Sequence, residues 1–304
     1  MAKKKKMPNA LRMEGDLSEL VKHLQDQNFD SMEEMQAYLD TLTGRPLSES
    51  LPQKRGRKSN AEKAQELVYE AYESEPEKGL RLIEKALKLD PQNVDALLFV
   101  AEFQDDPQQA QAYCQRAYDF ARGAFSEEDF EEMKGHFWGI HETRPYMRAK
   151  ESLAEFLYLN GSENEAIAHL WEMLELNPSD NQGMRYVLAV LLVEQNYLKD
   201  YLKLYKRYKD DMFVQWLYVY ALYLFKSEGK SAKSNKALKA VYKANPFLIE
   251  FMTGQRDIPE DMPEAYSLGS IEEAIVTLQD SGRLWLQDER AMMWLLDTFL
   301  GEEK

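Results

Sequence analysis

Two histidines and a glutamate stand close together near the middle of the chain, and these residue types could bind a metal ion. His136 and His141 are five residues apart, and Glu142 follows the second. Histidine pairs that bind zinc from one face of a helix are spaced four residues apart, and no third ligand follows here at a suitable spacing. We therefore expect no metal and no cofactor, and we interpret both histidines as packing and capping groups.

The sequence contains one cysteine, Cys114, as a candidate nucleophile. Its position in a predicted helix is normally buried, and a buried cysteine behaves as a small apolar residue. A single cysteine also excludes an internal disulfide and a zinc site built on two cysteines of this chain. Carboxylates are abundant but fall on predicted solvent-facing helix surfaces, so paired-acid catalysis has no support. The sequence predicts a protein that is not an enzyme.

The charge of the 304 residues is uneven and strongly negative, with a formal net charge of −15. Residues 1–60 hold 11 Lys and Arg against 9 Asp and Glu, which leaves −17 for residues 61–304. An acidic body repels phosphate backbones and anionic lipid, so it disfavours nucleic acid and membranes as partners. No uncharged stretch reaches the ~18 residues of a membrane span, and no apolar run of ~7–15 residues follows the basic start, as a signal peptide requires. We expect a cytoplasmic protein.

Three stretches share one template, in which a small residue is followed at helical spacing by two apolar residues and then by a proline. They are Gly79, Ile83, Ala86 and Pro91; Ala166, Leu170, Met173 and Pro178; and Ser234, Leu238, Val241 and Pro246. The last two prolines are 68 residues apart, twice the ~34-residue period of tetratricopeptide repeats. Small residues let antiparallel helices approach closely, and proline does not continue a helix. The pattern predicts an all-α superhelix, a tetratricopeptide-like solenoid, with helix pairs that start at Asn60, Val94, Met147, Asn181 and Gln215.

The first two prolines of the template are 87 residues apart, which reveals an insert at about residues 125–146. Ser126 and Asp129 predict a capped short helix at its start. The rest has no repeat periodicity and concentrates residues that could contact a partner, which are His136, Trp138, His141, Arg144 and Tyr146.

The two ends of the chain lack the template. We predict a disordered basic lead over 1–15, two short helices over 16–42 and a flexible basic linker over 43–60. Repeats then occupy 61–255, and a loop with capping helices fills 256–304. Asp16 with Glu19 and Ser31 with Glu34 predict the starts of the two N-terminal helices. Helices at the C-terminus suit the cap that a repeat array needs over its last apolar face.

Two runs carry a resemblance to a known family. They are Gly135-His136-Phe137-Trp138 through Arg148-Ala149, and Leu176-Asn177-Pro178 through Gln182-Gly183. With the repeats, they resemble bacterial relatives of the suppressor-of-tumorigenicity-seven family over roughly residues 60–265. That resemblance implies helical repeats and no established enzymatic activity.

In tetratricopeptide superhelices the first helix of each pair lines a concave groove. Mapping the groove positions onto this chain selects two arginines, three aromatic residues and two polar residues, which are Arg148, Glu151, Tyr158, Gln182, Arg185, Trp216 and Tyr223. Arginines would pair with carboxylates of an extended peptide, and the rings would cover its apolar side chains. Alternatively the protein's own segments fill the groove, with the insert as the candidate.

The function predicted from these features is a protein–protein interaction scaffold that binds a peptide or partner protein in the groove. The alternative is a nucleic-acid-associated protein tethered through residues 1–60. The core Arg55-Gly56-Arg57 of that segment could insert arginines into a narrow minor groove. The sequence does not predict an oligomeric state.

Overall fold

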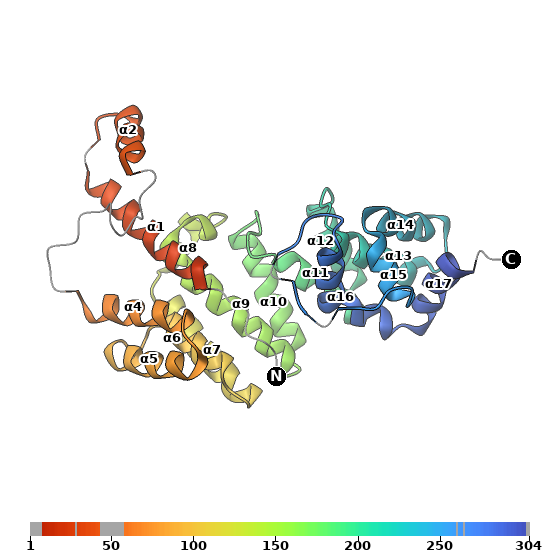
Figure 1. Ribbon diagram of the computed structural model, residues 1–304, viewed down its shortest axis with the longest axis horizontal. Coiled ribbons are helices and arrows are strands. Elements are labelled where there is room, and N and C mark those ends of the chain that lie inside the picture. The colour runs from red at the N-terminus through yellow and green to blue at the C-terminus, as the bar shows by residue number, and fades with distance from the viewer. Residues whose placement is uncertain (1–7, 28, 43–57, 260, 264, 302–304) are drawn as a thin grey trace. The chain divides into compact units, whose positions relative to one another are not determined.

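In the computed structural model, every secondary-structure element of the described residues is a helix (Figure 1). The structure describes residues 8–27, 29–42, 58–259, 261–263 and 265–301. The sequence prediction of an all-α fold is therefore confirmed. The predicted disordered lead over residues 1–7 and the predicted linker over residues 43–57 lie outside the described residues.

The helices of all five predicted pairs are present. The first helices are α4 (Asn60–Tyr72), α6 (Val94–Glu102), α9 (Arg144–Leu159), α11 (Met184–Glu194) and α13 (Val214–Glu228). Their second helices are α5 (Pro76–Leu89), α7 (Pro107–Gly123), α10 (Glu163–Leu176), α12 (Leu198–Arg207) and α14 (Ala232–Ala244). The nine small and apolar template residues are all buried, as the packing argument requires.

The chain forms two compact units, and the division between them falls within α10. Unit 1 consists of residues 1–169 and 175–178, and unit 2 of residues 170–174 and 179–304.

In unit 1, the first helix α1 (Pro8–Asp26) begins eight residues before the predicted start at Asp16. The prediction of disorder through residue 15 is therefore wrong for residues 8–15. Gly15 followed by Asp16 has the pattern of a helix start. A glycine inside a helix lowers stability by about 1 kcal/mol relative to alanine, and it is accepted where another group approaches too closely to leave room for a side chain. That group is Tyr69 of α4, whose Oη would lie 2.4 Å from a Cβ added to Gly15.

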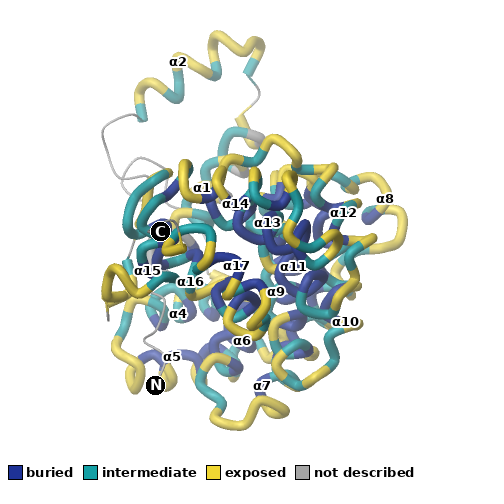
Figure 2. Tube along the Cα trace, turned by 90° about the vertical axis from the view of Figure 1, so that its right-hand side faces the viewer, coloured by how far each residue is buried: buried dark blue, intermediate teal, exposed yellow. Residues whose placement is uncertain are grey.

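The second N-terminal helix, α2 (Met32–Leu42), begins where the sequence predicts. The Ser31 hydroxyl accepts a hydrogen bond of 3.1 Å from the Glu34 backbone N–H, as a capping residue does. None of the described residues of α2 is buried (Figure 2). Contact with α1 runs through His23, whose Nε2 lies 2.7 Å from the Tyr38 hydroxyl.

The insert of unit 1 is an ordered element that packs on the start of α9. It contains α8 (Glu127–Met133) and two short 3-10 helices, η1 (Phe137–Gly139) and η2 (His141–Thr143). Ser126 and Asp129 form the capping box of α8. Phe130, Phe137 and Tyr146 form one aromatic cluster with ring centroids 5.0–5.9 Å apart.

In unit 2, three helices follow the last pair: α15 (Pro246–Met252), α16 (Ile271–Leu286) and α17 (Glu289–Leu300). Helix α16 packs against α11, α13 and α15, and so covers the first helices of unit 2. Ser270 caps it by accepting a hydrogen bond from the Glu273 backbone N–H. Gly282 lies inside this helix. No helix among the described residues combines the length and apolar character needed to cross a membrane.

The close helix approach in the first pair gives a direct test of the template. A Cβ added to Gly79 of α5 would lie 2.8 Å from Cζ of Phe99 and 3.0 Å from the Ala71 carbonyl oxygen. We expect Gly79→Val to lower the free energy of unfolding by about 1–3 kcal/mol in urea titrations, because overpacking forces the helices apart. Gly123→Ala, at the last residue of α7, adds its Cβ to open space and should raise the free energy of unfolding by about 0.4–1 kcal/mol, because the unfolded chain loses conformational freedom. Equal effects of the two substitutions would contradict the packing argument.

Candidate functional site

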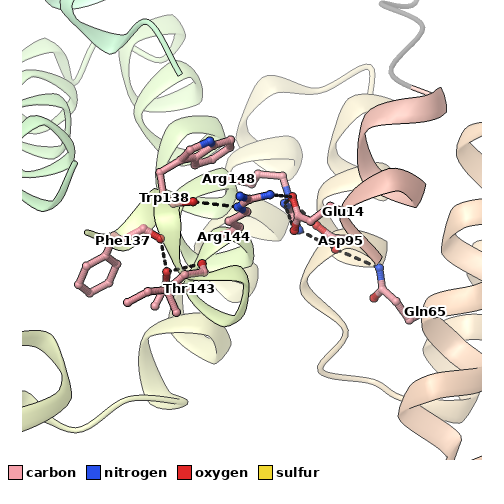
Figure 3. A network of polar contacts seen from close by, with 9 residues as sticks. Glu14, Gln65, Asp95, Phe137, Trp138, Thr143, Arg144 and Arg148 are labelled. Carbon is pink, nitrogen blue, oxygen red and sulfur yellow. Dashed lines mark hydrogen bonds and ion pairs between the residues drawn. The ribbon is translucent and has the colours of Figure 1, made fainter. Parts of the chain in front are cut away.

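The most elaborate polar cluster of unit 1 joins α1 to the first helices of the repeats (Figure 3). Arg148 of α9 donates from Nε to Asp95 Oδ1 at 2.9 Å and from Nη2 to Asp95 Oδ2 at 3.0 Å. Its third nitrogen, Nη1, donates to both carboxylate oxygens of Glu14 at 2.9 and 3.0 Å. Gln65 of α4 donates to Asp95 at 3.2 Å. One guanidinium thus links α9, α6 and α1.

Burial and opposite charges act on Arg148 together. Its side chain is 13% exposed, that of Asp95 6% and that of Glu14 15%. Burial lowers the pKa of the Arg148 guanidinium, but the charges of Asp95 and Glu14 and the hydrogen bonds to them outweigh it, so the pKa lies above its ordinary value. Bidentate arginine–carboxylate geometry of this kind fixes orientation as well as charge.

Tyr69 of α4 and Glu73, the residue that follows α4, complete the contact with α1. Burial, helped by the charge of Asp95, raises the pKa of the Tyr69 hydroxyl to about 12. Arg12 donates to Glu73 at 2.7 Å. Leu11 joins the apolar cluster of Ala64, Val68 and Phe99. We call the set Gln65, Tyr69, Glu73, Asp95, Arg144 and Arg148 the α1-binding surface.

Arg144 connects this surface to the insert. Its Nε donates to the Trp138 carbonyl oxygen at 2.9 Å, its guanidinium carbon lies 5.4 Å from the Trp138 ring centre, and its Nη1 lies 3.4 Å from Glu14 Oε2. The hydroxyl of Thr143, which is fully buried, donates to the carbonyl oxygens of Phe137 and Ile140. The insert therefore positions an arginine at the edge of the α1-binding surface.

The other predicted residues of unit 1 take different positions. Glu151 and Tyr158 are half-buried side chains of α9, and Tyr146 is buried in the aromatic cluster of the insert. His136 is exposed, whereas His141 is half-buried with its Nδ1 enclosed and without a hydrogen-bond partner. The described part of the chain has no cluster of three His, Cys, Asp or Glu side chains placed to hold a metal ion.

In unit 2, Arg185 is held by two acidic residues of its own unit. Its Nη1 donates to Asp180 Oδ2 at 2.9 Å and its Nε to Asp211 Oδ2 at 2.7 Å. Tyr186 closes the cluster by donating to Asp211 at 2.8 Å. The Arg185 side chain is only 16% exposed. This cluster ties the turn before α11 to the turn before α13.

The aromatic groove residues of unit 2 face its interior. Trp216 is 1% exposed and Tyr223 is 9% exposed. Trp216 stacks on Tyr205, and Tyr223 packs on Tyr201, so both rings face the second helix α12. The expectation that these two rings line a solvent-facing groove is therefore wrong. Gln182 is half-buried.

In unit 2, helix α16 occupies the first-helix surface that the sequence predicts to bind a partner. Trp285 is fully buried and stacks on Tyr218 of α13, with ring centroids 5.0 Å apart. Arg283 donates to Glu194 of α11 at 3.1 and 3.3 Å. The buried carboxylate of Glu273 accepts from the Val214 backbone at 3.1 Å and from Asn245 Nδ2 at 3.0 Å. Together these contacts make α16 part of the core of unit 2.

Sequence reasoning missed the partners of Arg148. Asp95 occupies the second position of its repeat, as Arg148 does in the next repeat, so opposite charges at matching positions of adjacent first helices were a usable signal. Glu14 has no such signal, because it falls within the predicted disordered lead.

Comparisons with known proteins concern the fold alone. No protein-family model and no curated protein matches the sequence. Among solved structures, the chain is similar to YrrB, described as a TPR protein with an unusual peptide-binding site. The two chains are 16% identical with a TM-score of 0.40, and the match covers 68% of this chain and 91% of that one. The relationship to the suppressor-of-tumorigenicity-seven family stays a prediction.

The Asp95–Arg148 pair predicts a large effect on stability. Arg148→Met leaves Asp95 buried without its cation, so we expect a loss of about 3–5 kcal/mol in the free energy of unfolding at pH 7, measured with urea. Adding Asp95→Asn should restore part of the loss, because the unpaired charge is removed. Arg116→Met, at an exposed arginine of α7, is the control and should stay within about 0.5 kcal/mol. Strictly additive losses in the double variant would contradict direct coupling.

Burial of Cys114 predicts an unreactive thiol. Burial raises the pKa of the Cys114 thiol to about 12, so at pH 8 very little thiolate forms in the folded protein. We expect an aromatic disulfide reagent to label the folded protein more than a hundredfold more slowly than the protein in urea. The raised pKa also predicts a pH dependence of the free energy of unfolding. The contribution of the protonated Cys114 thiol is fully present below about pH 8.5 and is lost as the pH rises towards 12.

The matched control for this labelling is the variant Cys114→Ala with Gln115→Cys, which moves the thiol to the neighbouring exposed position. Its thiol should react rapidly in the folded state. Equal labelling rates for the two folded proteins would contradict the burial of Cys114.

Proposed function

We propose that this protein is a non-enzymatic interaction scaffold and that the α1-binding surface of unit 1 binds a segment of a partner protein. One observation carries the proposal: this surface already holds a segment that is distant in sequence. Glu14 and Arg148 are 134 residues apart and meet through two hydrogen bonds. The first helices of three successive pairs, α4, α6 and α9, supply the contacts.

The chemistry of the surface favours a carboxylate-bearing ligand. Asp95 and Glu14 balance the charges of Arg144 and Arg148, so without Glu14 the three remaining residues carry one net positive charge where the carboxylate was bound. Glu73, the other acidic residue of the surface, pairs with Arg12 of α1. A positive site in a protein with a net charge of −15 attracts a carboxylate locally while the surrounding acidic body disfavours anionic polymers. Asp95 still neutralises Arg148 when Glu14 is absent, which limits the cost of an empty surface.

Unit 2 is the less suitable site. Its first-helix surface is covered by α16, whose buried residues include Ala274, Ser281 and Trp285. Arg185, Trp216 and Tyr223 are engaged within the unit, so we propose only the Arg148 side of the predicted groove as a partner site. Residues 54–57 of the alternative nucleic-acid tether lie outside the described residues, and Lys58 pairs with Glu66 of α4.

The proposal is tested by crosslinking and affinity capture from the native source with tagged full-length variants. Arg144→Gln removes one cation from the surface and leaves the Asp95–Arg148 pair intact, so folding should be preserved. We expect partners to be depleted at least fivefold relative to the wild type, quantified by mass spectrometry, because a carboxylate contact is lost.

Arg116→Gln is the matched control, an exposed arginine outside the surface, and should capture the same partners as the wild type. A combined Asp95→Asn and Arg148→Met variant removes the central ion pair without leaving a buried charge, and should also lose the partners. Full retention of every partner by both surface variants would rule out this site.

A further inference from the structure

The hold of α1 on unit 1 is weak for a helix of 19 residues. Among the described side chains of α1, only Leu11 is buried. Leu17 is 41% exposed, Val21 39% and Met13 59%. Helix α16, which covers the equivalent surface of unit 2, has eight buried residues among its 16. With one of its described side chains buried, α1 is the replaceable occupant, and α16 is not.

The contacts of α1 define what the surface recognises. Leu11, Glu14 and Gly15 are spaced i, i+3 and i+4, so they share one helix face. Leu11 enters an apolar cluster with Val68 and Phe99, and the Glu14 carboxylate meets Arg148 and Arg144. Gly15 allows the close approach of Tyr69. The pattern is an apolar anchor, a carboxylate one turn later and a small residue next to it.

We infer that the partner of the α1-binding surface is an amphipathic helix that presents Leu-x-x-Glu-Gly or a close equivalent, and that α1 occupies the surface as an internal competitor. This inference rests on the proposed function. Recognition of a helix through anchors one turn apart is a common mode of peptide binding. A charge-paired anchor gives specificity, because a helix without the carboxylate would leave the Arg148 donor unpaired.

The connection between α1 and the repeats sets the strength of the competition. Helix α1 and the repeats belong to one chain, so α1 competes intramolecularly, at an effective concentration on the order of 1 mM. If α1 as a separate helix has an intrinsic dissociation constant of about 10–100 µM, a partner helix binds the wild-type protein roughly 10- to 100-fold more weakly than a protein whose α1 is released.

The test uses a fluorescein-labelled peptide of residues 8–26 and fluorescence anisotropy with full-length protein. The released variant carries Leu11→Ser with Glu14→Gln, which removes both anchors from the internal helix and leaves the surface unchanged. We expect it to bind the peptide at least tenfold more tightly than the wild type does. The control carries the same changes on exposed positions of the same helix, Leu17→Ser with Glu19→Gln, and should bind the peptide as the wild type does.

The peptide is varied in parallel. Glu14→Gln in the peptide should weaken binding to the released variant at least fivefold, whereas Glu19→Gln should leave it unchanged. Circular dichroism melting checks that the released variant stays folded. Equal affinity of the three proteins for the peptide, or no binding to the released variant, would overturn the inference.

A concentration-dependent wild-type dimer that the released variant fails to form, measured by light scattering, would make a second copy of α1 the occupant and would also overturn the inference.

Partner capture separates the inference from the function on which it rests. Arg144-dependent partners should be captured at least fivefold better by the released variant than by the wild type. Equal capture would overturn the competition and leave the proposed function intact. Peptide exchange without any Arg144-dependent partner would overturn the proposed function, because the surface would then serve only the protein's own helix.

Discussion

The ion pair between Asp95 and Arg148 organises unit 1, because it is a buried, bidentate polar contact that crosses the insert. The two residues are 53 apart in sequence, and the insert between them breaks the repeat period. Two parallel N–H to oxygen bonds fix the rotation of α9 relative to α6, which apolar packing alone specifies less sharply. The same guanidinium keeps one nitrogen for Glu14, so the contact that sets the register of the repeats also creates the surface that holds α1.

The two units solve one physical problem in two ways. First helices of a repeat leave one face without a neighbouring helix pair, and an apolar face in water is unfavourable. Unit 2 covers it with α16, through stacked Trp285 and the buried carboxylate of Glu273. Unit 1 covers it with α1, mainly through one leucine and one charged anchor. The apolar burial of α16 builds a permanent core, whereas the contact of α1 through Leu11 and Glu14 is specific and readily exchanged.

The insert acts as a support and does not itself fill the surface. Its buried aromatic cluster and the Thr143 hydroxyl hold η1 against α9, and the Trp138 carbonyl accepts from Arg144. The contiguous run of His, Trp and Arg in the sequence predicts a segment that contacts a partner. In the structure the segment supports α9 instead, because local composition indicates where side chains concentrate but not which of them turn inward.

The sequence by itself determined the helices and their pairing, because small and apolar residues at 3.6-residue spacing, closed by proline, can bury their faces only as antiparallel pairs. It also determined the position of the insert, through the interrupted period. Tertiary structure alone decided that Glu14 meets Arg148, since a contact across 134 residues leaves no periodic trace. It likewise decided that Trp216 and Tyr223 face α12, because helical spacing places residues on one face but does not determine which neighbour that face meets. Helix α1 extends through Gly15 for the same kind of reason: the close approach of Tyr69 outweighs the local preference of glycine for a helix end.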